Sequence, residues 1–317
     1  MIWHGDNMNG LKGIFSHDNG FTQLTIALFV AFSSLIALFG LECVALWIIY
    51  KPASLESFNA LITGDIALLK LSQALQAFAL FIFPAFITAF LLTKTTVSDY
   101  LSLKNKANIT VYMLVALAAI FALPSVNALA ELNNAITFPP FLHGFEVWAR
   151  SLEDAAQELT EKFLSVSGIP GLLLNIFVVA VLAAVGEELI FRGVLQRIFT
   201  NWTKSETLGI WLTAFVFSVV HFQFFGFLPR LLLGAFFGYL LVWTRTIWLP
   251  TLAHFIHNGV SVVAFYLHHN GYIQANPDEV GTSGMLWLSA VTTVLFLGIV
   301  YWIQHASLAA LSDRSQH

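Results

Sequence analysis

The stretch "VGEELIFRGVLQ", residues 185–196, decides the fold, because it places three ionisable side chains in a run that is otherwise apolar enough to span a membrane. A carboxylate or guanidinium in the middle of a membrane helix costs about 2.5–3.5 kcal/mol even on the most lenient insertion scale. Glu188 and Arg192 are four residues apart, so they share a helical face and can pair, whereas Glu187 is rotated from Glu188 by about 100°. An ion pair explains Glu188 and Arg192 and leaves Glu187 to be explained by function.

The rest of the chain has the composition of an integral membrane protein. Of its 317 residues, 58% are hydrophobic and 10% are charged, and the mean hydropathy is +0.78. Lipid-exposed backbone must satisfy its hydrogen bonds internally, and a spanning helix needs about 20 apolar residues. We therefore predict an all-α fold, a polytopic transmembrane bundle of about eight spans. The expected spans lie near residues 23–50, 71–93, 110–128, 169–199, 208–227, 228–244, 246–268 and 284–304.

The spans divide the chain into three regions. We expect residues 1–168 to form an N-terminal membrane region with three spans and an amphipathic segment at 129–168, and residues 169–270 to form the core that carries the chemistry. Residues 271–317 supply a final span and a tail. More Lys and Arg residues fall inside than outside if the amino terminus is cytoplasmic, which favours a multi-pass protein of the cell membrane with both termini in the cytoplasm.

Several classes of function are excluded by residues that the chain lacks. Cys43 is the single cysteine, so an intramolecular disulfide and a cysteine-rich metal site are impossible. The net charge of −4 with no basic run argues against nucleic acid as a partner. A serine nucleophile would need a Gly-x-Ser-x-Gly elbow, which is missing, and Asp65 has no second intramembrane aspartate with which to form an aspartyl protease pair.

Two further apolar stretches contain histidines. "FVFSVVHFQFFGF", residues 215–227, is expected to place His221 in an aromatic helix with Phe217 one turn earlier, where its ring can pack on the imidazole. "WLPTLAHFIHNGV", residues 248–260, places His254 and Asn258 on one helical face. His257 can reach the same cavity, although we favour a bond to a neighbouring helix. Polar groups on three helices therefore predict a site inside the bundle.

These residue types suit the hydrolysis of a peptide bond. The reaction needs an activated water, an acid for the leaving amine and hydrogen-bond donors for the developing oxyanion. A buried carboxylate and a histidine that share one water can take its proton and later return it. Glu187 and His221 fit this requirement.

The ordered set of motifs resembles the CPBP family of intramembrane endopeptidases, which includes CAAX prenyl proteases and bacteriocin-processing enzymes and is also called the Abi family. The matching positions are Glu187, Glu188 and Arg192, then Phe217 and His221, then His254 and Asn258. The resemblance covers about residues 169–270 and implies that Glu187 and His221 activate the water. It further implies that His254 and Asn258 steady the oxyanion, while Glu188 and Arg192 are architectural.

The resemblance leaves the requirement for a metal open, since the family is often described as metalloproteases. No H-E-x-x-H helix is present, and the favoured mechanism of the family uses glutamate directly, so we expect no cofactor. The alternative is an open zinc site with Glu187, His221 and His254 as ligands and a water in the fourth position.

The expected partners are the lipid bilayer and a peptide or protein substrate in or at the membrane, whose identity the sequence does not specify. Buried Glu, Arg and His also mark proton-coupled transporters, which are the main alternative. A membrane scaffold without catalytic activity is a third hypothesis. It gives no reason to bear the insertion cost of the polar side chains.

Overall fold

A computed structural model describes residues 10–314 of the chain, with side chains up to residue 307. Helices make up nearly all of the regular structure in this range, and it contains no strand, so the predicted all-α class is confirmed. By length and composition, six helices in the described residues can cross a membrane, close to the predicted eight. They cover Gly20–Tyr50, Ile66–Leu92, Ile109–Asn134, Ile169–Thr203, Phe224–Thr244 and Leu286–Ser307. The protein is thus a multi-pass membrane protein.

The other two predicted spans, 246–268 and 208–227, are not among these six helices. Helix α14 (Trp248–His269) has the predicted length of a span, but its polar residues keep it out of the six. Helix α12 (Glu206–Val219) has 14 residues, so the predicted helix over 208–227 is wrong in its second half. A turn at residues 220–222 follows, with Phe222 in the left-handed region at φ +53°, and then a short 3₁₀ helix, η5 (Phe224–Gly226). His221 therefore lies in a turn and not in a helix.

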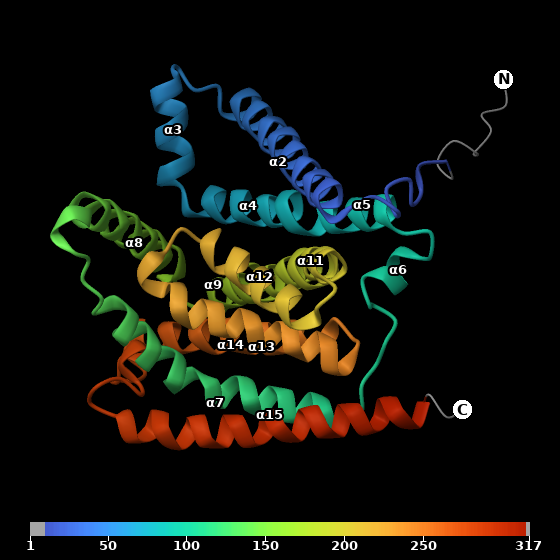
Figure 1. The fold of residues 1–317 in the computed structure, drawn as a ribbon. Coiled ribbons are helices and arrows are strands. Elements are labelled where there is room, and N and C mark those ends of the chain that lie inside the picture. Colours follow the sequence, from blue (N-terminus) through green and yellow to red (C-terminus); the bar gives the residue numbers. More distant parts are fainter. Residues whose placement is uncertain (1–9, 315–317) are drawn as a thin grey trace, which may run out of the picture. The chain divides into compact units, whose positions relative to one another are not determined.

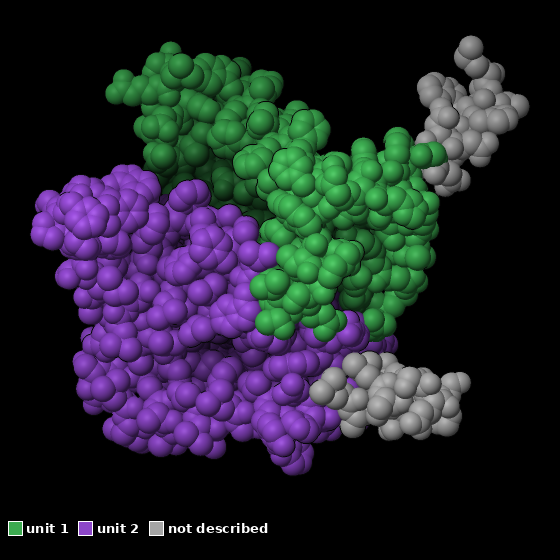
Figure 2. Space-filling view, in the orientation of Figure 1, with its two compact units in different colours: residues 1–105, 185–209 green, residues 106–184, 210–317 purple. Residues whose placement is uncertain are grey.

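The chain forms two compact units, coloured separately in Figure 2. Unit 1 comprises residues up to 105 together with 185–209, and unit 2 comprises residues 106–184 and 210 onward. The predicted core, residues 169–270, draws on both units. One boundary falls inside helix α10 (Ala183–Ile190).

Unit 1 is built around helix α2 (Gly20–Tyr50), which begins where the Asn19 side chain accepts a hydrogen bond from Thr22 N at 2.9 Å. Helix α2 packs on a run formed by α4 (Ile66–Ala77), the π-helical turn η1 (Phe78–Ile82) and α5 (Phe83–Leu92). Pro84 lies at the start of α5 and does not end this run. The unit also contains α3 (Leu55–Gly64), α6 (Val97–Tyr100), the second part of α10, the π-helical turn η4 (Phe191–Leu195) and α11 (Gln196–Thr203).

In unit 2, helix α7 (Ile109–Asn134) runs beside helix α15 (Leu286–Arg314), and both pack on α13 (Phe227–Thr244) (Figure 1). The core between these helices and α14 contains buried Val115, Ala118, Phe237, Leu240 and Ala253. Pro124 lies inside α7 without ending it. The remaining elements are η2 (Pro140–Leu142), α8 (His143–Leu164), α9 (Ile169–Asn175), the π-helical η3 (Ile176–Leu182) and η6 (Pro277–Glu279). Helix α8 is the helix that the sequence predicts within 129–168.

The loop before α15 approaches α7 closely at one glycine. Gly281 has φ +91°, and a methyl group added to it would lie 2.5 Å from the Pro124 carbonyl oxygen and would also overlap the Ser289 hydroxyl. That hydroxyl contacts both the Pro124 oxygen at 2.9 Å and the Gly281 oxygen at 2.5 Å. Glycine is required here both for backbone conformation and for space.

We expect Gly281→Ala to lower the free energy of unfolding by roughly 1–3 kcal/mol, because the new methyl group adds strain and steric overlap. Gly284→Ala is the matched control, since nothing lies within 4 Å of a methyl group at that position. Thermal unfolding of both variants in the same detergent, followed by tryptophan fluorescence, checks this. Equal melting temperatures for the two variants would contradict it.

Candidate active site

The predicted ion pair is present in unit 1. Arg192 Nη1 lies 2.9 Å from Glu188 Oε1, and both side chains are fully buried. The guanidinium also lies 5.9 Å from the centre of the Phe191 ring. A charge that is removed from water needs a partner of opposite sign, and here the carboxylate and the guanidinium compensate one another.

Glycines on either side of this pair allow other parts of unit 1 to approach. A methyl group added at Gly186 would lie 3.1 Å from Phe81 Cβ, and one added at Gly193 would lie 2.9 Å from Leu101 Cδ2. Glu187 is on a different face of the helix from Glu188 and is half-buried. The two adjacent glutamates therefore occupy different surroundings, as the sequence predicts.

In unit 2, the backbone fixes the orientation of His221. Its Nδ1 lies 2.6 Å from the carbonyl oxygen of Phe217. A carbonyl can only accept a hydrogen bond, so Nδ1 carries the proton, and in the neutral ring the lone pair is on Nε2. A lone pair on Nε2 suits either a general base or a metal ligand.

The Phe217 ring contacts two of the predicted histidines. Its centre lies 4.9 Å from that of His221, with the planes at 66°, and 6.1 Å from that of His254, with the planes at 87°. His254 is buried and also stacks on Phe237 at 5.1 Å. The predicted packing of Phe217 on His221 is confirmed. Unit 2 thus brings His221 and His254 to the same aromatic ring.

Asn258 is half-buried on α14, one turn after His254. Its Nδ2 donates a hydrogen bond to the carbonyl oxygen of Val179 in η3 at 3.0 Å. A carboxamide nitrogen has two hydrogens, so this bond orients the group and uses one donor. His257 is half-buried, and its Nδ1 has no hydrogen-bond partner among the described residues, so a bond from this side chain to a neighbouring helix stays a prediction.

The sequence analysis missed Gln223 and Arg230, which follow His221. Arg230 lies in the first turn of α13, and its Nη2 donates a hydrogen bond to Gln223 Oε1 at 2.7 Å. An arginine within an apolar span is the signal that could have identified this pair.

The six predicted site residues divide between the units. Glu187, Glu188 and Arg192 belong to unit 1, while His221, His254 and Asn258 belong to unit 2. A centre that combines Glu187 with the histidines stays a prediction. Within either unit, the described residues include no group of three His, Cys, Asp or Glu side chains that could hold a metal ion. The alternative zinc site of Glu187, His221 and His254 draws on both units and also stays a prediction.

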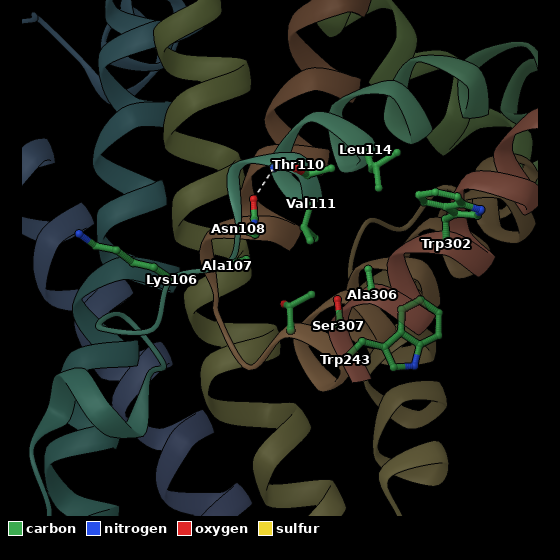
Figure 3. Close-up of a pocket in the computed structure, with 11 residues that line it drawn as sticks. Lys106, Ala107, Asn108, Thr110, Val111, Leu114, Trp243, Trp302, Ala306 and Ser307 are labelled. Atoms are coloured by element: carbon green, nitrogen blue, oxygen red, sulfur yellow. Dashed lines mark hydrogen bonds between the residues drawn. The ribbon is translucent and has the colours of Figure 1, made fainter. Parts of the chain in front are cut away.

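Unit 2 contains three cavities of interest. One of about 620 Å³ lies among the amino end of α7 and the carboxyl ends of α13 and α15, and none of the predicted site residues lines it (Figure 3). The other two run along α14 near Asn258. An apolar groove of about 420 Å³ includes Phe255, Gly259 and Val260, and a more polar cavity of about 410 Å³ includes Ser261.

Comparison with known proteins finds similarity in the same part of the chain. The sequence model of the Rce1-like family, described as type II CAAX prenyl endopeptidases, matches residues 169–260. This match agrees with the resemblance drawn from the motifs, and the matched residues lie within the predicted core.

A curated relative is the uncharacterized protein YpbD of Bacillus subtilis (strain 168), which is 27% identical over 115 residues. The alignment covers 35% of this chain and 54% of the relative, so the chain spans about half the length of the relative that it matches. No solved structure matches the chain.

We expect Glu188→Gln to destabilise the protein by about 3–5 kcal/mol, because it leaves the buried Arg192 charge without its carboxylate. Glu187→Gln is the matched control, since it makes the same chemical change at the adjacent, half-buried position. Thermal unfolding in detergent should show a clearly lower melting temperature for Glu188→Gln than for Glu187→Gln. The reverse order would show that Glu188 does not compensate Arg192.

Proposed function

We propose that this protein is an intramembrane endopeptidase that hydrolyses peptide bonds of a membrane-associated peptide or protein. The observation that carries the proposal is the contact of His221 and His254 with the single ring of Phe217, inside the segment that matches the Rce1-like endopeptidases. Two imidazoles that contact one ring, of which His221 has its proton on Nδ1 and its lone pair on Nε2, suit water activation and oxyanion stabilisation.

In the proposed mechanism, Glu187 and His221 bind one water. As the water oxygen attacks the peptide carbonyl carbon, its proton passes to this pair and the carbonyl electron pair moves to the oxygen. His254 and the second N–H of Asn258 donate hydrogen bonds to that oxyanion. The carbon–nitrogen bond then breaks, and the proton is delivered to the departing amine. The products are a carboxylic acid and an amine.

Glu188 and Arg192 have a positioning role in this mechanism. Because the pair is fully buried within unit 1, it determines which face of α10 is turned into that unit, and the neighbouring Glu187 lies on another face. In unit 2, the hydrogen bond from Asn258 Nδ2 to the Val179 carbonyl oxygen has a positioning role of the same kind, because it fixes the Asn258 side chain of α14 against η3.

A metal-dependent version of the same protease is the alternative. Glu187, His221 and His254 would hold a zinc ion, which would polarise the water and the substrate carbonyl. Because Nδ1 of His221 carries the proton, the lone pair on Nε2 could bind a zinc ion as well as it could act as a base. We propose the metal-free mechanism, and a chelator separates the two.

The substrate is proposed to be a membrane-associated segment with apolar side chains. The apolar groove along α14 is lined by residues of that helix together with Ile176 and Ile273, and it offers an apolar segment a place on the helix that also carries His254 and Asn258. We further propose a location in the cell membrane with both termini in the cytoplasm, on the basis of the Lys and Arg distribution.

We expect Glu187→Gln and His221→Ala each to reduce cleavage by about 100-fold or more, because general acid–base catalysis contributes about 10²–10⁴-fold. The measurement is mass-spectrometric detection of products from a library of apolar and prenylated peptides, with purified protein in lipid vesicles. His269→Ala at the exposed end of α14 is the control.

The same assay is repeated with a chelator. Retained cleavage supports the metal-free mechanism, and cleavage lost with the chelator and restored by zinc supports the alternative. Full cleavage by Glu187→Gln would overturn the proposed function. Proton-coupled solute uptake that depends on Glu187, without cleavage of any peptide, would favour a transporter.

A further inference from the structure

We propose that Glu153 of α8 is a positioning residue that holds the turn carrying His221 in its catalytic orientation. This inference rests on the proposed function, because it assigns α8 a role in the same site. All of the contacts that carry it lie within unit 2.

Both oxygens of the Glu153 carboxylate hold the segment that follows His221. Oε2 accepts a hydrogen bond from the backbone N–H of Phe225 at 3.2 Å, and Oε1 accepts one from Gln223 Nε2 at 3.3 Å. The oxygen of Gln223 in turn accepts from Arg230 Nη2 at 2.7 Å. A carboxylate, a carboxamide and a guanidinium therefore form a chain of alternating acceptors and donors across α8, the segment after His221 and α13. Gln223 is two residues from His221.

The segment needs such partners because its backbone is no longer α-helical after Val219, in a stretch of the chain that is mostly apolar. Unpaired backbone groups are costly where water is excluded, and non-helical backbone is tolerated there only when protein groups satisfy it. Asn133 of α7 supplies two further bonds, donating to the Phe224 oxygen at 2.9 Å and accepting from Leu228 N at 3.2 Å. Ser218 donates to the Phe227 oxygen at 2.7 Å. Glu153 is the charged member of this set, and hydrogen bonds to charged groups are the stronger ones.

Aromatic contacts join α8 to the same segment. The Phe224 ring lies 5.2 Å from Phe145 and 5.6 Å from Trp148, and the Arg150 guanidinium lies 4.1 Å above the Phe225 ring. These contacts hold α8 against η5 beside the Glu153 bonds. A change at Glu153 alone therefore loosens the turn without detaching the helix.

The direct test compares Glu153→Ala, Glu153→Gln and the control Glu158→Ala, which changes an exposed carboxylate one turn further along α8. Because small misplacements of a catalytic group are costly, we expect Glu153→Ala to lower kcat by about tenfold or more while KM changes less than about twofold. Glu153→Gln keeps an acceptor for Phe225 N and should recover much of kcat. Glu158→Ala should match the parent protein in kcat and KM.

A second measurement does not depend on catalysis. Hydrogen exchange read by mass spectrometry should show faster exchange, by about tenfold, in peptides covering residues 220–228 of Glu153→Ala, with α14 peptides unchanged. Unchanged exchange and unchanged kcat would overturn the positioning role. A fall in activity matched by an equal fall in folded protein would also overturn it, because it would reveal a general loss of stability.

The two proposals can fail separately. If no peptide is cleaved by the parent protein, the proposed function fails, and exchange in residues 220–228 still decides whether Glu153 holds the turn. If Glu187→Gln abolishes cleavage and Glu153→Ala retains full kcat, only the positioning role fails.

Discussion

The buried ion pair between Glu188 and Arg192 is the interaction on which the geometry of the candidate site depends. Two charges in a water-excluded interior are tolerated only together, and because both lie on one helical run, that run cannot rotate without exposing the pair. Glu187, the adjacent residue, is thereby held on a fixed and different face. The glycines at 186 and 193 permit close approach of Phe81 and Leu101, which surround the pair with packed protein. Packing and charge thus act on one helix to orient a third ionisable group.

In unit 2 the corresponding constraint is the satisfaction of backbone groups outside the helices. The chain leaves helix α12 at Val219, and the turn that follows is completed by side chains of Asn133 and Glu153, which come from other helices. The helix end also determines the tautomer of His221, because the Phe217 carbonyl oxygen accepts a hydrogen bond from Nδ1–H. The orientation of the His221 ring therefore follows from its contact with the backbone, and the ring of Phe217 also contacts His254.

Local spacing in the sequence predicted what a single helix determines. The Glu188–Arg192 pair, the packing of Phe217 on His221 and the amphipathic helix α8 all depend on residues within a few turns of one another, and all are present. The end of α12 could not be predicted, because residues 215–225 are almost entirely apolar and contain neither Gly nor Pro. Hydropathy measures how a residue partitions into lipid. It carries no information about side chains far along the chain that stop a helix by bonding its backbone.

The residues that the sequence analysis missed differ from those it found in one physical respect. Glu187, His221 and His254 are conspicuous because each is a polar side chain in an apolar stretch, where its presence is costly. Glu153 lies among other charges on an amphipathic helix, where a carboxylate is ordinary, and only its contacts with Gln223 and Phe225, 70 and 72 residues away, distinguish it from Glu158. Insertion cost therefore identifies the polar side chains that are candidates for chemistry in a membrane protein. It overlooks the groups that hold them from a more polar helix, because for those groups the sequence shows no penalty that requires an explanation.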